Sequence, residues 1–486
     1  MSAEPTGFLN VRVEMVGLPC LGRGNPNHLH FMRRSKRILM VVALLGLGLP
    51  STRAGLLFTN LISLVAANGS YPVAGLVQGL DGNFYGTAYQ GGSGIPGSGT
   101  VFRISAGGVF SNLFSFNSSN GANPYAGLVQ GTNGNFYGTT EQGGTNGGFG
   151  SIFEITPAGA LTTLLSFNNT NGAYPEATLA PGADGNFYGT TSAGGTNGGF
   201  GTVFRISPAG DFASLVSFNN TNGASPYAAL TQGKNGNFYG TTVAGGTNGG
   251  YGTAFEMTST GSLTTLYSFD NTNGANPYAA LVLGADRNWY GTASSGGASN
   301  NGTIFLISSA GAFTTLFAFN GADGAYPYGS LLQCADGSFY GTTEAGGTNN
   351  YGTVFKWSPG GGLLQLISFD YISNGSYPLA GLIQGADGDF YGTAHRGDAG
   401  VKGGVFRISA PVAPVFKSAA VSAGSMWLSW TSVAGQTYQL QGCSGFNPTN
   451  WYLLGTNYLA TNGMASASDS VPLYPSQRFY RVVLLP

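Results

Sequence analysis

Residues 124–140 read Pro-Tyr-Ala-Gly-Leu-Val-Gln-Gly-Thr-Asn-Gly-Asn-Phe-Tyr-Gly-Thr-Thr, and close copies of this stretch recur along most of the chain. Its Phe-Tyr-Gly-Thr motif, which reads Trp-Tyr-Gly-Thr in one copy, occurs seven times, at intervals of 50 to 52 residues. A fixed period of this length is typical of proteins that stack one supersecondary unit many times. The tyrosines of the seven copies are Tyr85, Tyr137, Tyr188, Tyr239, Tyr290, Tyr340 and Tyr391.

The first six copies carry signals for four short strands. A proline precedes a short apolar strand, which an Asn-Gly or Asp-Gly pair, or Asp286-Arg287 in the fifth copy, connects to Phe-Tyr-Gly-Thr through a tight hairpin turn. A glycine-rich loop leads to a third strand of the type Gly-Thr-Val-Phe-Arg-Ile-Ser, and a Pro-Ala-Gly turn leads to a fourth. Four antiparallel strands per copy are typical of a propeller blade. The sequence therefore predicts an all-β chain with a seven-bladed β-propeller of four-stranded blades over residues 55–409.

Two columns of aromatic side chains recur in the copies. Stacking the blades face to face would bury each ring and stabilise the fold by about 1.5 to 3 kcal/mol per ring, so we interpret both columns as structural. The first column is Phe84, Phe136, Phe187, Phe238, Trp289, Phe339 and Phe390. The second is Phe102, Phe153, Phe204, Phe255, Phe305, Phe355 and Phe406.

The two ends of the repeat region predict how the ring closes. The seventh copy has three strands and no fourth, whereas Leu57–Val65 precedes the first copy with the spacing of a fourth strand. Pairing this segment with the seventh copy would leave no open sheet edge. The alternative is an open solenoid, which would be expected to carry atypical capping repeats at both ends.

The N-terminal region resembles an export signal. A basic segment, Met32–Arg37, precedes the apolar run Ile38–Leu49, which is too short to span a bilayer comfortably, and Thr52-Arg53-Ala54 suits a cleavage site. We interpret residues 32–54 as a signal peptide, with an uncleaved membrane anchor as the alternative. Residues 1–31 are then an N-terminal extension, and translation is expected to begin at Met32. The mature chain is expected to be secreted or on the cell surface, without a transmembrane segment.

A second domain is predicted after the repeats, over residues 412–486. Four segments alternate between apolar and polar residues, as strands of a small β-sandwich do. They are Ser425–Trp430, Gln436–Leu440, Asn450–Leu454 and Arg478–Val483. The pattern resembles an immunoglobulin-like or fibronectin type III module, although the paired cysteines of antibody domains are absent.

Charge and cysteine content exclude several classes of function. The net charge is −1 and only 8% of residues are charged, with no basic cluster after the signal segment, so nucleic acid is not an expected partner. His395 is the one histidine after that segment, and no His or Cys cluster has metal-ligand spacing, so neither a metal nor a cofactor is predicted. Cys334 and Cys443 fall in different predicted domains, and no disulfide is expected. We expect a monomer.

Candidate binding residues come from a column that differs between copies, four residues after each repeated tyrosine. This column begins a loop, so its side chains are expected on one face of the disc, where binding sites concentrate. An unconstrained surface position is the alternative interpretation. The seventh loop is distinctive because it replaces neutral residues with His395-Arg396-Gly397-Asp398. The predicted binding residues are Tyr89, Glu141, Ser192, Ser294, Glu344, His395, Arg396 and Asp398.

A further column follows the second phenylalanine and alternates in charge over the first four copies. It reads Arg103, Glu154, Arg205 and Glu256. The alternation predicts ion pairs between successive blades, which would contribute little free energy if exposed.

The repeated unit resembles the GloVer (Gloeo-Verruco) tandem repeat of bacterial surface proteins. The resemblance rests on Pro-Tyr-Ala-Gly-Leu-Val-Gln-Gly, Gly-Asn-Phe-Tyr-Gly-Thr-Thr and Gly-Thr-Val-Phe-Arg-Ile-Ser-Pro-Ala-Gly, and it covers about residues 56 to 409. Members of this family are described as choice-of-anchor proteins, in which different surface-sorting tails follow the repeats. The tail Leu484-Leu485-Pro486 does not match such an anchor, so secretion without one is expected. The resemblance implies no catalytic residues.

These observations favour an exported, non-enzymatic propeller that binds carbohydrate or another cell-envelope component. The alternative is an extracellular hydrolase or lyase acting on polysaccharide, with a site on one face of the propeller. Such an enzyme would need carboxylates that converge at one mouth of the channel, and Glu141, Glu344 and His395 are the best candidates.

Overall fold

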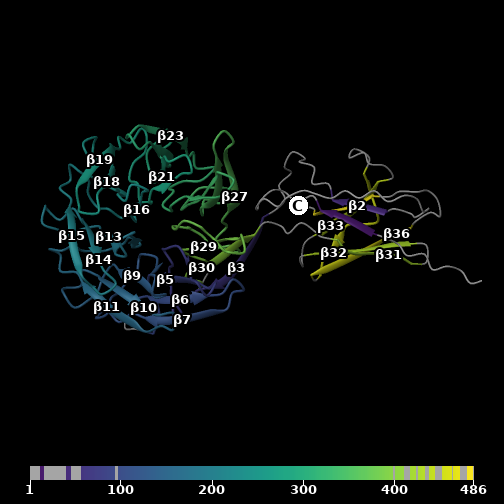
Figure 1. Cartoon of the computed structure of the whole chain (residues 1–486), viewed down its shortest axis with the longest axis horizontal. Helices are drawn as coiled ribbons and strands as arrows, with labels where there is room; N and C mark the ends of the chain where they lie inside the picture. Colours follow the sequence, from purple (N-terminus) through teal and green to yellow (C-terminus); the bar gives the residue numbers. More distant parts are fainter. Residues whose placement is uncertain are drawn as a thin grey trace, which may run out of the picture. The chain divides into compact units, whose positions relative to one another are not determined.

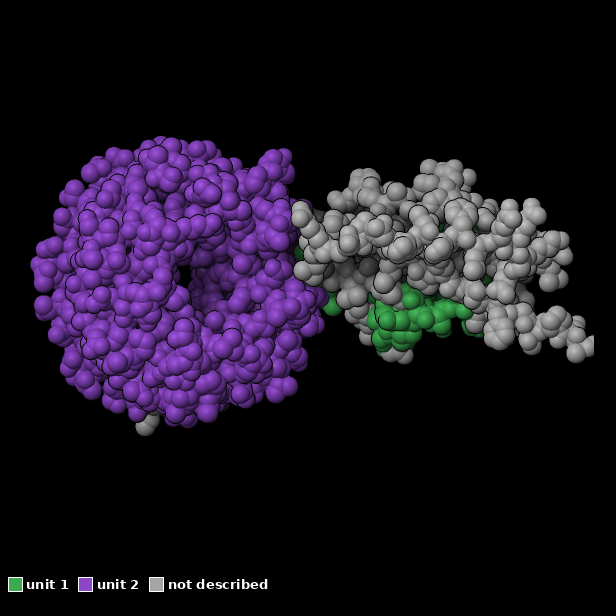
Figure 2. Space-filling model, viewed as in Figure 1, with its two compact units in different colours: residues 1–57, 410–486 green, residues 58–409 purple. Residues whose placement is uncertain are grey.

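The computed structural model describes residues 11–15, 40–44, 56–93, 97–397, 400–409, 416–422, 425–432, 437–443, 451–461, 463–470 and 479–484. Within these ranges all regular secondary structure is β-strand, so the predicted all-β class is confirmed. None of the described segments is a helix that could span a membrane. The chain divides into two compact units, Phe58–Ser409 and a second that combines Met1–Leu57 with Ala410–Pro486 (Figure 2).

Phe58–Ser409 contains seven four-stranded sheets, numbered here in chain order (Figure 1). The first contains β4 (Val77–Gln78), β5 (Phe84–Ala88), β6 (Thr100–Ile104) and β7 (Phe110–Ser115). The second contains β8 (Val129–Gln130), β9 (Phe136–Thr140), β10 (Ser151–Ile155) and β11 (Leu161–Ser166), and the third β12 (Ala180–Pro181), β13 (Phe187–Thr191), β14 (Thr202–Ile206) and β15 (Phe212–Ser217). The fourth contains β16 (Thr231–Gln232), β17 (Phe238–Thr242), β18 (Thr253–Met257) and β19 (Leu263–Ser268), and the fifth β20 (Val282–Leu283), β21 (Trp289–Ala293), β22 (Thr303–Ile307) and β23 (Phe313–Ala318). The sixth contains β24 (Leu332–Gln333), β25 (Phe339–Thr343), β26 (Thr353–Ser358) and β27 (Gly362–Ser368), and the seventh β28 (Ile383–Gln384), β29 (Phe390–Ala394), β30 (Gly404–Ser409) and β3 (Leu57–Ser63).

The same two contacts join each sheet to the next one around a central opening (Figure 2). The repeated tyrosine of one sheet packs on the first-column aromatic ring of the next, with ring centroids 3.9 to 4.6 Å apart in all seven pairs. The threonine of each Tyr-Gly-Thr donates its hydroxyl proton to a backbone oxygen of the next sheet, at 2.8 to 3.4 Å. The first aromatic column therefore packs between sheets, as predicted.

The glycine between these tyrosines and threonines is required by close packing within each sheet. A Cβ atom on Gly189 would lie 2.4 Å from Phe204 Cζ and 2.8 Å from Leu179 Cδ2. Such an approach is impossible without displacing a fully buried ring. The second aromatic column is thus buried against a surface that only glycine leaves open.

The first and last sheets meet through β3, which lies beside β30 in the seventh sheet. Leu64 donates its backbone N–H to Gly403 O at 2.8 Å and accepts the N–H of Lys402 at 2.8 Å. Tyr391 packs on Phe84 with ring centroids 4.0 Å apart, and Thr393 donates to Ala74 O at 3.0 Å. The predicted pairing of the N-terminal strand with the seventh copy is therefore confirmed.

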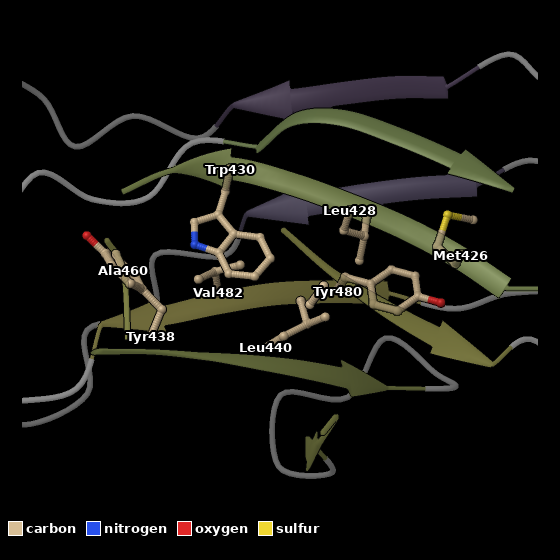
Figure 3. Close-up of a cluster of buried hydrophobic side chains, with 9 residues drawn as sticks. Met426, Leu428, Trp430, Tyr438, Leu440, Ala460, Tyr480 and Val482 are labelled. Atoms are coloured by element: carbon tan, nitrogen blue, oxygen red, sulfur yellow. The ribbon is translucent and has the colours of Figure 1, made fainter. Parts of the chain in front are cut away.

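The described residues from Phe416 onward, in the other unit, form two sheets that share one core. One sheet has the order β31 (Phe416–Ser422), β32 (Ser425–Thr431) and β36 (Met464–Ser470), and the other pairs β33 (Thr437–Cys443) with β34 (Tyr452–Leu453), β35 (Tyr458–Leu459) and β37 (Phe479–Leu484). Alternate residues of β32, β33 and β37 meet in the core, with Trp430 and Tyr438 fully buried (Figure 3). Of the residues before β3, only the parallel pair β1 (Val11–Met15) and β2 (Met40–Leu44) is described, so the rest of the predicted signal peptide lies outside the described residues.

The predicted ion pairs between sheets are wrong. Glu154 accepts hydrogen bonds from Asn133, Asn135 and Tyr137 of its own sheet, at 2.8 to 3.0 Å. Glu256 accepts the corresponding three from Asn235, Asn237 and Tyr239, at 2.7 to 3.0 Å. The strand register explains this result. Glu154 is the cross-strand partner of Tyr137, and its carboxylate accepts the hydroxyl proton of that tyrosine within the same sheet.

The alternation of charge follows the residue at the hairpin turn. Sheets with Asn at the turn carry Glu on the third strand, as in Asn133 with Glu154. Sheets with Asp at the turn mostly carry Arg or Lys, as in the sixth sheet, where Lys356 Nζ lies 2.8 Å from Asp336 Oδ2. Six of the seven sheets therefore match the third-strand residue to their own turn, whereas the fifth has Asp286 with Leu306. In six sheets the tyrosine hydroxyl donates to the local carboxylate, as from Tyr85 to Asp81 and from Tyr137 to Glu154.

A double-mutant cycle separates these two interpretations. We expect Arg205→Ala and Glu256→Ala to show a coupling free energy close to zero in thermal or denaturant unfolding, because the two residues belong to different local networks. Asn235→Ala and Glu256→Ala should couple by about 0.5 to 1.5 kcal/mol, the usual contribution of a hydrogen bond. The reverse ranking would contradict the register argument.

Candidate binding site at the mouth of the central channel

All seven sheets contribute to one cavity of about 590 Å³. Since every sheet lines it, the cavity lies at the central opening of the ring (Figure 2). Each sheet contributes the residue that directly follows its repeated proline and precedes its first strand. These residues are Val73, Tyr125, Glu176, Tyr227, Tyr278, Tyr328 and Leu379.

Tyrosine rings form a nearly continuous row along part of the cavity wall. The ring centroids of Tyr227 and Tyr278 are 5.1 Å apart, and those of Tyr278 and Tyr328 are 4.9 Å apart. Burial raises the pKa of Tyr227 and of Tyr328 to about 12, and it raises the pKa of Tyr125 further. The phenols therefore stay neutral at physiological pH, and they offer ring faces together with hydroxyl groups.

Three carboxyl groups lie among these rings, on Glu141, Glu176 and Glu344. Burial, and then the charge of Glu141, raise the pKa of Glu176 to about 8. Burial also raises the pKa of Glu344, an effect that the nearby Arg396 opposes. The Glu176 carboxyl group therefore keeps its proton at neutral pH and can donate a hydrogen bond, as the tyrosine hydroxyl groups can.

Small residues form the remainder of the cavity wall, because the segments before the first strands approach one another closely. A Cβ atom on Gly381 would lie 2.4 Å from Ser330 O of the neighbouring sheet. Gly127 donates its N–H to Thr178 Oγ1 of the next sheet at 3.0 Å. The polar and aromatic groups are therefore concentrated where the tyrosines and glutamates stand.

The structure brings three of the predicted binding residues into this cavity, namely Tyr89, Glu141 and Glu344. Ser192 lies beside it, with Oγ 3.1 Å from Glu176 Oε1. Ser294 is 1% exposed and donates its hydroxyl proton to Asn276 O at 2.9 Å, so it is not available to a ligand.

The two predicted residues of the seventh loop that the structure describes, His395 and Arg396, do not line the cavity. His395 packs against Tyr71, with ring centroids 5.2 Å apart, and burial lowers its pKa to about 4, so the imidazole is neutral. Arg396 is exposed, with its guanidinium carbon 6.0 Å from the centroid of the Tyr71 ring. Asp398 lies outside the described residues. The cavity thus joins Glu141 and Glu344 without His395.

Sequence reasoning missed Glu176 and the tyrosine column that accompanies it. A usable signal was present, because the residue after each repeated proline changes from copy to copy while Ala or Gly follows it in every copy. The comparison of copies that pointed to Glu141 would also have found this column. The repeated proline was interpreted only as the start of a strand, and the residues that follow it were not compared between copies.

Several solved structures match parts of this chain at low sequence identity. The extracellular domain of a B. thetaiotaomicron protein described as a hybrid two-component system matches with 11% identity and a TM-score of 0.48, over 88% of this chain and 55% of that one. PorZ, a surface component of the type-IX secretion system of Porphyromonas gingivalis, matches with 14% identity and a TM-score of 0.44, over 79% of this chain and 53% of that one. The β-propeller domain of the trilobed protease from Pyrococcus furiosus matches with 7% identity and a TM-score of 0.41, over 70% and 95% of the two chains. The chain spans about half the length of the first two proteins.

Comparison with families of known sequence gives a direct assignment. A search among curated proteins finds no match to this sequence. The Gloeobacter/Verrucomicrobia repeat matches three overlapping regions, residues 50–180, 96–305 and 249–442. These regions include all seven copies of the repeated unit, so the chain belongs to the Gloeobacter/Verrucomicrobia repeat family.

Proposed function

We propose that this protein binds a carbohydrate of the cell envelope or its surroundings at the mouth of the central channel. The observation that carries the proposal is one cavity of about 590 Å³ lined by four tyrosines of the post-proline column and three glutamates. This volume lies within the range of small-molecule sites, which is roughly 300 to 1,000 Å³. Sugars present apolar C–H faces that stack on aromatic rings and hydroxyl groups that bind carboxylates.

The proposal includes the architecture that presents this site. The seven sheets are the blades of a closed seven-bladed propeller over residues 55–409, and residues 412–486 are an immunoglobulin-like or fibronectin type III-like sandwich. The protein is exported by a signal peptide over residues 32–54 and acts as a monomer, secreted or on the cell surface. Membership of a repeat family known from bacterial surface proteins supports this location.

A second candidate function is hydrolysis or lysis of polysaccharide at the same cavity. It is favoured by Glu176, whose raised pKa of about 8 keeps it protonated beside Glu141, as general acid catalysis requires. Glu141 would serve as the base or nucleophile. Release of reducing or unsaturated ends from a polysaccharide panel, lost in Glu176→Gln, would establish this activity; no release with retained binding would exclude it.

Titration calorimetry with a panel of oligosaccharides tests the binding function. We expect Tyr278→Ala to weaken binding by about tenfold, or 1.4 kcal/mol, because this ring packs between two others in the row. Tyr251→Ala is the matched control, since Tyr251 is 37% exposed and does not line the cavity. Binding that is equally strong in both variants, or no binding by any saccharide, would contradict the proposal.

A further inference from the structure

The charges around the cavity are unbalanced. Three carboxyl groups line it, while none of its described lining residues is Lys, Arg or His. Glu344 has Arg396 as a cationic neighbour. The groups that act on Glu176 are Glu141 and Ser192, and neither is a cation. Among the residues that the structure describes, Glu176 beside Glu141 is therefore a carboxyl group without a positive neighbour.

Ser192 is a neutral hydrogen-bond donor to one of these two carboxyl groups. Its Oγ lies 3.1 Å from Tyr174 O and 3.1 Å from Glu176 Oε1, so its single proton is shared between the two oxygens. This bond lowers the pKa of Glu176, but burial and the charge of Glu141 outweigh it and raise that pKa to about 8. Glu176 therefore keeps its proton at neutral pH although Ser192 donates to it.

Aromatic rings share this place with the two carboxyl groups. Glu176, when ionised, raises the pKa values of Tyr89, Tyr125, Tyr227 and Tyr278, and Glu141 raises those of Tyr89 and Tyr227, so the carboxyl groups and the rings lie near one another. Tyrosine faces attract cations by about 0.5 to 2 kcal/mol, more strongly when water is excluded. Two carboxyl groups among tyrosine rings, with no cation among the described lining residues, suit a ligand that carries its own positive charge.

We propose that the cavity takes an amino sugar, whose protonated amine is held by Glu141 and Glu176 against the tyrosine rings. This inference rests on the proposed carbohydrate function and narrows its substrate class. Binding converts the Glu176 carboxylic acid and the ligand ammonium group into a carboxylate–ammonium pair and releases one proton to solvent. No covalent bond within the ligand forms or breaks.

The test compares a glucosamine tetramer with the fully N-acetylated tetramer, which has the same backbone and no charge. We measure binding to the full chain by calorimetry at pH 7 in phosphate and in Tris buffer, whose different ionisation heats report proton release. The amine form should bind at least tenfold more tightly and release a large fraction of one proton, whereas the acetylated form should release none. Since this comparison changes only the ligand, it does not depend on the folding of any variant.

Two variants and one control assign the effect to these residues. Glu176→Gln should abolish the proton release, and Glu141→Gln should reduce the preference for the amine by tenfold or more. Asp211→Asn removes one negative charge from the turn between β14 and β15, away from the cavity lining, and should leave both measurements unchanged.

The outcomes separate this inference from the function on which it rests. Equal affinity for the two tetramers would overturn the amino-sugar inference and leave carbohydrate binding standing. Preference for the amine without proton release would overturn the role of Glu176. Binding of cyclohexylamine with proton release, without binding of any saccharide, would overturn carbohydrate binding itself.

Discussion

A chain that begins at Ala66 is expected to lose the cooperative thermal unfolding of the seven-sheet unit, because it lacks β3. This strand supplies the fourth member of the seventh sheet. Leu64 is fully buried, and the Phe58 ring stacks on Phe406 with centroids 5.2 Å apart. Each large apolar side chain buried in this way contributes roughly 1.5 to 3 kcal/mol. Deletion also exposes the edge of β30, an edge that promotes aggregation.

A chain that begins at Leu56 is the matched control, since it lacks the segments before β3 and keeps the strand itself. Differential scanning calorimetry should give this control a sharp transition and the shorter chain a broad or absent one, with a Tm lower by 10 °C or more, corresponding to about 5 kcal/mol or more. A synthetic peptide spanning residues 56–66, added in excess, should restore part of the lost Tm. Equal melting temperatures for the two chains would show that the ring does not depend on its N-terminal strand.

Glu176→Gln is expected to be more stable than the native chain at pH 8 and equally stable at pH 4.5. The pKa of Glu176 is raised from an ordinary value of 4.5 to about 8, so the folded state holds its proton over a range in which the unfolded state has lost it. The native chain therefore loses stability as pH rises between these two values. Glutamine does not titrate, and the variant escapes this loss. One pKa unit corresponds to about 1.4 kcal/mol, so the difference at pH 8 should reach a few kcal/mol.

Glu154→Gln provides a control of opposite sign. Burial alone would raise the pKa of Glu154. Hydrogen bonds from Asn135, Tyr137 and Asn133 outweigh this effect and lower the pKa below its ordinary value. The carboxylate of Glu154 therefore stabilises the folded state above the ordinary pKa, and the glutamine variant should be less stable than the native chain at neutral pH. Melting curves from pH 4 to pH 9 measure both effects. If Glu176→Gln instead lowers stability at pH 8, the carboxyl group of Glu176 in the native chain must be ionised and paired in the folded state.

The local pattern of the sequence was sufficient to predict most of the strands. The Asn-Gly and Asp-Gly turns and the alternating residues act over a few residues, so they predict the strands of each copy without tertiary information, and the regular spacing shows that the unit repeats. The sequence also shows that the seventh copy lacks a fourth strand and that an extra strand segment, Leu57–Val65, precedes the first copy. The pairing of β3 with β30 confirmed that reading.

The side chains that line the channel could not be assigned in the same way. Glu176 and Tyr227 belong to different copies, 51 residues apart, and only the circular arrangement of the sheets brings them to one cavity. The prediction of ion pairs between successive sheets was wrong for a related reason. The alternation of charge suggested partners in neighbouring copies, whereas the cross-strand register pairs Glu154 with Tyr137 in its own sheet.

The sequence by itself determined the repeated unit, its strands, its turns and the residues that stack between sheets, because these depend on local propensity and on burial that is the same in every copy. Only the tertiary structure decided which variable residues share a site. Closing seven copies into a ring places the residues after the repeated prolines around one axis. There, burial and the neighbouring charge of Glu141 give Glu176 a protonation state that no isolated copy would have.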